Sequence, residues 1–113
     1  MHKTRNDLPL KTRKQVVELL NARLVDAIDL GLQAKQAHWN VKGPNFIALH
    51  ELFDKIAEHA EGHVDALAER ITALGGTARG TVRTVAARSS LKPYPENIYT
   101  GTQHLEALAV ALA

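Results

Sequence analysis

Two long segments with helical periodicity, joined by a short stretch that interrupts a helix, constrain this chain most. From about Lys11 to His38, apolar residues recur every three or four positions, which is typical of a helix with one buried face. The sequence VKGPN then breaks the pattern, because glycine can end a helix and proline can begin the next one. The periodicity resumes from about Phe46 to Leu74, before Gly75 and Gly76. These features predict an antiparallel pair of long helices.

The rest of the chain predicts a connector and the beginning of another helix. The sequence TARGTVRTVAARSSLKPYPEN is rich in loop-forming residues, and one short helix is expected around Val82 to Arg88. The sequence TQHLEALAVALA is strongly helical, with Thr102 as the expected cap, and no alternating apolar run indicates a strand. This helix reaches Ala113 without a cap or a polar tail, so we expect a C-terminally truncated chain. The sequence therefore predicts an all-α fold, the front part of a four-helix bundle.

Length and composition exclude several classes of protein. A chain of 113 residues forms at most one small domain, which we divide into a basic tail over residues 1–10 and a helical domain over residues 11–113. The absence of cysteine excludes disulfides, thiolate metal sites and thiol catalysis. No apolar run approaches the roughly 18 residues of a membrane span, and the first residues lack the apolar core of a signal peptide. We expect a soluble intracellular protein with no membrane partner.

A polar stripe runs along the second predicted helix. At about 100° per residue, six side chains fall within an arc of about 100°. They are His50, Asp54, Glu58, Glu61, Asp65 and Glu69. Asp54 and Asp65 lie about 16 Å apart along such a helix, whereas ligands of a transition metal lie about 2 Å from the ion. One chain therefore cannot close this stripe around a single ion.

A second copy of the same helix could complete the site. If two copies pack antiparallel about a two-fold axis near residues 59 and 60, position i faces position 119 − i. Asp54 then faces Asp65, and His50 faces Glu69. Each pair of chains would contain two equivalent sites, each with His50 and Asp54 from one subunit and Asp65 and Glu69 from the other.

The chemistry of this residue set favours a redox metal. Imidazoles with carboxylates and no thiolate suit iron, manganese or zinc, and several carboxylates can hold two ions, so redox-active iron is the natural candidate. His38, one turn before the hairpin, is expected near His50, with Trp39 beside it. The alternative is that the acids form a solvated face and that His38 is a core residue. Glu58 and Glu61 are interpreted in that way because they would face and repel each other.

Specific sequence motifs resemble one protein family. The stretch KQAHWNVKGPNFIALHELFD, followed by DALAERITALGG, resembles the Dps-type miniferritins, the DNA-protecting proteins of starved bacterial cells. The resemblance covers residues 11–113. It implies a ferritin-like four-helix bundle that assembles as a hollow dodecamer, of which this chain supplies the first hairpin, the connector with its short helix and the start of the third helix. It also implies that Fe(II) is oxidised, preferably by hydrogen peroxide, at dinuclear sites across two-fold axes and stored inside.

The resemblance also implies roles for individual residues. Position by position, His38, His50 and Asp54 match the catalytic iron ligands of one subunit, and Asp65 and Glu69 match those of its partner. Trp39 matches the tryptophan beside that centre. The expected location is the bacterial cytoplasm, or the nucleoid if the protein binds DNA.

A basic N-terminus suggests a second activity. Some members of the family bind DNA through basic N-terminal tails, and cations repeated around a cage could bind DNA without sequence specificity. The candidate DNA-binding residues are Lys3, Arg5, Lys11, Arg13 and Lys14. Such termini are also common as solvated tails. The alternative function is therefore a non-enzymatic nucleoid protein whose acidic stripe is only an interface, while Arg79, Arg83 and Arg88 could neutralise acids within the bundle.

Overall fold

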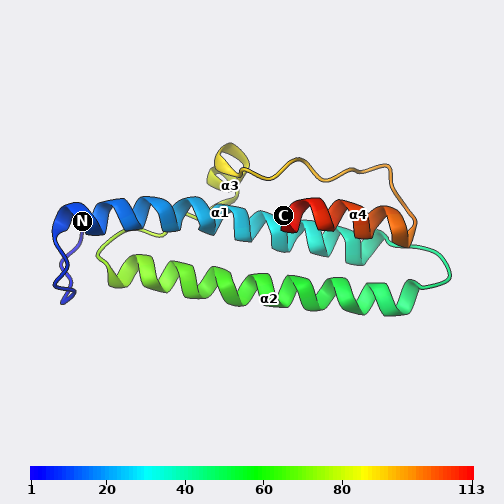
Figure 1. The fold of residues 1–113 in the computed structure, drawn as a ribbon, viewed down its shortest axis with the longest axis horizontal. Helices are drawn as coiled ribbons and strands as arrows, with labels where there is room; N and C mark the ends of the chain where they lie inside the picture. The colour runs from blue at the N-terminus through cyan, green and yellow to red at the C-terminus, as the bar shows by residue number, and fades with distance from the viewer.

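A long helical hairpin forms the body of the molecule. The computed structural model describes residues 1–113 and measures 54 × 23 × 21 Å. Helices α1 (Leu10–Asn40) and α2 (Phe46–Ala73) run antiparallel along the long axis, while α3 (Val82–Arg88) and α4 (Gly101–Leu112) both contact α1 (Figure 1). The predicted all-α fold is confirmed, and each bound of the two long helices lies within two residues of the expected one.

The turn between α1 and α2 also receives the start of α4. Gly43 has a φ of +113°, a conformation that favours glycine. The neighbouring Lys42 N–H donates to the carbonyl of Tyr99 at 2.8 Å, so the connector returns to this turn. Helix α4 begins there with a capping box between Thr100 and Gln103. The prediction of Thr102 as the cap was therefore wrong by two residues, because the Thr100 hydroxyl is the one that accepts from the Gln103 N–H.

The core lies where α4 covers the hairpin. Phe53 is completely buried, and small residues around it allow α1 and α2 to approach closely. The core cluster comprises Ala34, Ala37, Val41, Phe53, Ala57 and Leu108. This packing fixes α1 and α2 relative to each other at the hairpin end, where His38, His50 and Asp54 lie.

One histidine is part of this core. His104 of α4 is 1% exposed, and its Nδ1 lies 2.6 Å from the Tyr94 hydroxyl. Burial raises the pKa of Tyr94 to about 12, so the hydroxyl keeps its proton and can donate. Burial also lowers the pKa of His104, against an opposing effect of the Ile98 backbone. Its Nε2 has no partner in hydrogen-bond geometry, so the ring is incompletely satisfied.

The first residues of the chain are docked on the far end of α2. The His2 N–H donates to Gly75 O at 2.7 Å, and the Thr4 hydroxyl donates to Ala73 O at 2.6 Å. The Arg13 guanidinium donates to Leu74 O at 3.2 Å. These bonds satisfy carbonyls that have no partner within the helix. The segment predicted as a basic tail is thus attached at its first residues.

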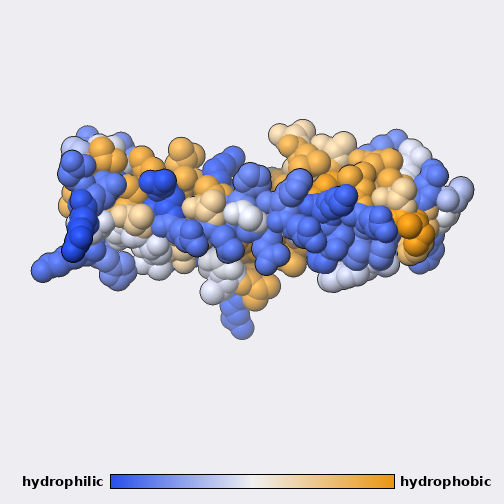
Figure 2. All heavy atoms as spheres, turned by 90° about the horizontal axis from the view of Figure 1, so that it is seen from below, coloured by the Kyte–Doolittle hydropathy of each residue, from blue (hydrophilic) through white to orange (hydrophobic).

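Several large apolar side chains remain on the surface. Leu19, Leu32, Ile47 and Val110 are each more than half exposed. Figure 2 shows apolar groups separated by a broad hydrophilic region. Exposed apolar area of this kind often marks contact surfaces with other protein. None of the helices combines the length and apolar character that crossing a membrane would require.

Candidate metal centre

The two histidines on either side of the hairpin turn lie against each other. Their ring centroids are 3.7 Å apart and the ring planes differ by 20°. His38 Nδ1 lies 2.5 Å from the carbonyl oxygen of His50, and His50 Nδ1 lies 2.7 Å from that of His38. A carbonyl oxygen only accepts hydrogen bonds, so each Nδ1 carries the proton and donates it. In the neutral imidazole, this tautomer leaves each Nε2 with a lone pair that can bind a metal ion.

Local structure explains part of this arrangement. His38 lies in the last turn of α1, where carbonyl groups lack a partner within the helix. The imidazole of His50, one turn into α2, supplies that missing donor. The same hydrogen bond therefore satisfies the end of α1 and sets the tautomer of His50.

Asp54 follows His50 by one turn and carries a negative charge. Its carboxylate forms an ion pair with the ammonium group of Lys35 from α1. The hydrogen bond from Lys35 contributes most to lowering the pKa of Asp54, and the charge of Lys35 also lowers it, while desolvation opposes them. Asp54 is therefore a carboxylate at neutral pH, which is the form that binds metal ions.

The remaining two predicted ligands lie apart from this group. Asp65 and Glu69 are exposed, farther along α2, and neither takes part in an ion pair. No group of three or more His, Asp or Glu side chains gathers closely enough in the chain to hold a metal ion. The structure thus brings His38 and His50 together near Asp54, and leaves Asp65 and Glu69 separate.

A hollow between α1 and α2 adjoins Asp54. Its lining combines apolar residues of both helices with charged groups. These residues are Ala27, Ile28, Gly31, Leu32, Lys35, Asp54, Ala57, Glu58, Glu61 and Val64. An apolar surface edged by carboxylates lies along the stripe that we predicted to face a second subunit.

The other candidates have different surroundings. Trp39, next to His38, is 64% exposed, and Glu58 and Glu61 are exposed as expected for a solvated face.

Lys35 contacts a predicted ligand but was not among the residues predicted from the sequence. Its position three residues before His38, on the same side of α1, was the available signal.

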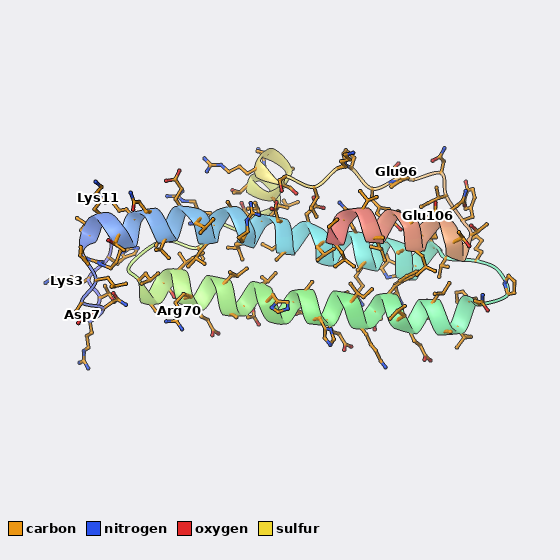
Figure 3. The ribbon with its side chains drawn as sticks, viewed as in Figure 1. Lys3, Asp7, Lys11, Arg70, Glu96 and Glu106 are labelled. Atoms are coloured by element: carbon orange, nitrogen blue, oxygen red, sulfur yellow. The ribbon has the colours of Figure 1, made fainter.

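The candidate DNA-binding cations surround one end of the molecule. Lys3, Arg5, Lys11 and Lys14 are exposed, and Figure 3 shows Lys3 and Lys11 at the same end as Arg70. Arg13 is half-buried, and its guanidinium also donates to Leu8 O at 3.0 Å.

The connector arginines do not neutralise acids within the chain. The ion pairs of the chain are Arg23 with Asp26 and Lys35 with Asp54. Arg79, Arg83 and Arg88 are therefore without a carboxylate partner in this structure.

Comparisons with known proteins agree on one family. The ferritin-like domain family matches residues 17–112. The DNA protection during starvation protein of Agrobacterium fabrum is 50% identical over 107 residues, which are 95% of this chain and 66% of that protein. The protein of the same name from Mycolicibacterium smegmatis is 39% identical over 98 residues, 87% of this chain and 54% of that one.

Solved structures give the same result. The structure of Mycobacterium smegmatis Dps in a tetragonal form has a TM-score of 0.91 and 36% identity, covering 98% of this chain and 67% of that chain. DpsA14 from Streptomyces coelicolor has a TM-score of 0.90 and 36% identity, covering 96% and 64%. The chain thus spans between about half and two thirds of the length of these relatives. It belongs to the ferritin-like family and, within it, to the Dps-type miniferritins.

Proposed function

We propose that this chain is a subunit of a ferroxidase and iron-storage protein that oxidises Fe(II) at dinuclear sites between two-fold-related subunits. The observation that carries the proposal is the pair of reciprocal hydrogen bonds between His38 and His50. It leaves both Nε2 atoms free beside a charged Asp54. Because these hydrogen bonds set the tautomer of both histidines, neither imidazole has to move a proton between its nitrogens before a metal binds.

The partner subunit supplies the remaining ligands in this proposal. The ligand set within one chain is incomplete, since no three of these groups gather around one point. With two α2 helices antiparallel across a two-fold axis, Asp65 and Glu69 of the partner subunit would meet His50 and Asp54. The apolar hollow beside Asp54 supports this pairing, because a second helix packed there would cover it.

Two iron ions in one site explain how such a protein would protect DNA. Two Fe(II) ions give one electron each to one hydrogen peroxide, which takes up two protons and yields two water molecules. A single Fe(II) gives one electron and releases hydroxide and a hydroxyl radical. Pairing the ions, with peroxide as the preferred oxidant, therefore removes both reactants without the radical. The Fe(III) product would be stored within a homododecamer in the bacterial cytoplasm.

Non-specific DNA binding is a second candidate function. The exposed cations around the N-terminal end favour it, and so do the printed names of the relatives, which concern DNA protection. Binding through phosphate contacts would weaken steeply with added salt. A nucleoid protein without ferroxidase activity would bind DNA equally well after loss of His50, which separates the two functions.

The first experiment is an anaerobic Fe(II) titration of the purified chain, with its size measured by light scattering. A stoichiometric peroxide pulse then follows Fe(III) by absorbance. We expect saturable uptake near two irons per site, lost in both His50→Ala and Asp65→Ala. His63→Ala is the matched control, because this histidine is exposed on α2 outside the polar stripe.

Mixing the two inactive variants tests whether the site is shared. A dimer that contains one His50→Ala chain and one Asp65→Ala chain has one doubly damaged site and one intact site. Random reassembly of equal amounts should restore about one quarter of the wild-type sites. No restoration from a properly assembled mixture would contradict a site between subunits. Unaltered iron uptake by either variant alone would contradict the ferroxidase assignment.

A further inference from the structure

Lys35 places a positive charge at the candidate centre without being a metal ligand. Its ammonium group comes from α1 and pairs with Asp54 of α2, the carboxylate expected to bind iron. The two side chains are 39% and 33% exposed, so both can change partners without disturbing the core. A divalent ion bound to Asp54 would lie close to this ammonium group and would repel it.

A second set of carboxylates lies within the same hollow. Lys35, Asp54, Glu58 and Glu61 all line it, and Glu58 is one helical turn beyond Asp54. Glu58 and Glu61 have no cationic partner in the chain. Across the proposed two-fold axis, Glu58 would face Glu61 of the partner subunit, and two unpaired carboxylates in that position would repel each other.

We propose that Lys35 is a movable counter-ion that links metal loading to subunit association. In the metal-free protein it neutralises Asp54. When a divalent metal ion binds Asp54, the ammonium group moves to Glu58 and to Glu61 of the partner subunit, where it offsets their repulsion. The proposal rests on the function proposed above. Since coupling between two binding events is reciprocal, metal would strengthen association and association would strengthen metal binding.

Zinc binding to the metal-free protein provides the first test, because Zn²⁺ probes the ligands without redox chemistry. Lys35→Met should raise zinc affinity by about twofold to fivefold, the range set by a partly exposed ion pair. Lys55→Met is the matched control, since Lys55 follows Asp54 directly, is exposed and forms no ion pair. Lys55→Met removes the same charge and should have little effect on zinc affinity. Equal zinc affinity in wild type and Lys35→Met would overturn the proposal.

A double-mutant cycle provides the second test. Subunit dissociation is measured by sedimentation for wild type, Lys35→Met, Glu58→Gln and the double variant, with and without Zn²⁺. With zinc, Lys35→Met should weaken association about twofold to fivefold, and adding Glu58→Gln should restore it, because the repulsion that Lys35 offsets is then removed. Glu58→Gln alone should not weaken association, with or without zinc. A double variant as weak as Lys35→Met in the presence of zinc would overturn the proposal.

One comparison separates failure of this inference from failure of the proposed function. If wild-type protein binds zinc and His50→Ala does not, the shared centre stands and the Lys35 variants alone decide the inference. If wild type shows no zinc binding that depends on His50, the proposed function and the inference both fail.

Discussion

Gly75 lies where the N-terminal segment crosses the end of α2, and replacing it by alanine should loosen this contact. Its φ of +87° costs alanine about 1–2 kcal/mol. The new Cβ would lie 2.7 Å from His2 O, so the segment must shift. That shift would break the His2–Gly75 hydrogen bond and strain the Thr4–Ala73 bond, each worth about 0.5–1.5 kcal/mol. We expect a loss of about 2–5 kcal/mol, a large part of a domain stability of about 5–15 kcal/mol.

Substitutions at two other glycines separate the backbone cost of Gly75→Ala from the cost of the lost contacts. Gly43 also has a positive φ, of +113°, but its added Cβ would meet no atom within 4 Å. Gly43→Ala therefore reports the conformational cost alone, about 1–2 kcal/mol. Gly62 lies within α2 with open space around it, so Gly62→Ala should stabilise by about 0.5–1 kcal/mol.

Urea unfolding followed by far-ultraviolet circular dichroism measures all three variants. Protein concentration is held equal, because subunit association contributes to apparent stability. The expected order of stability is Gly62→Ala, wild type, Gly43→Ala and then Gly75→Ala. If Gly75→Ala is no less stable than Gly43→Ala, the contact between the N-terminal segment and the end of α2 does not contribute to stability. That result would refute the prediction.

Three further predictions use the core and the single tryptophan. Phe53→Ala should cost about 3–5 kcal/mol in urea unfolding, since this ring is completely buried, and a loss below 1 kcal/mol would contradict the described core. Burial lowers the pKa of His104 below 6.5, so below pH 6.5 the unfolded chain binds a proton that the folded chain does not. Wild-type stability should therefore fall as pH decreases from 6.5 to the lowered pKa, and His104→Phe should flatten this part of the profile; an unchanged slope would argue against it. Trp39 is exposed beside His38, so Co²⁺ bound at the histidine pair should quench its fluorescence, and persistence of that quenching in His50→Ala would exclude this pair as the ligand.

How well the sequence predicts a feature depends on how far apart in the chain the interacting residues lie. Helix bounds depend on local periodicity, so α1, α2 and α3 were found closely. The proximity of His38 and His50 was expected from their distance to the turn, but their reciprocal bonds depend on the exact register across residues 41–45. The Lys35–Asp54 pair spans nineteen positions, and the Thr4–Ala73 bond spans sixty-nine. The spacing of Lys35 from His38 indicates its side of α1 but not its partner, and no local pattern reveals the Thr4–Ala73 bond. Sharing of Asp65 and Glu69 with a partner remains a prediction, because a single chain cannot test it.

The two kinds of ligand at the proposed centre differ in how they would accept iron. The histidines hold each other in the metal-binding tautomer, so they are preorganised. Asp54 instead pairs with Lys35 and must exchange a partner. With neutral histidines, Asp54 and the partner's Asp65 and Glu69 would bring three negative charges against the four positive charges of two Fe(II) ions. Retaining the ammonium group would double the excess positive charge from one to two. We therefore expect the imidazoles to bind the first iron ion. The second ion should bind only when Lys35 leaves Asp54.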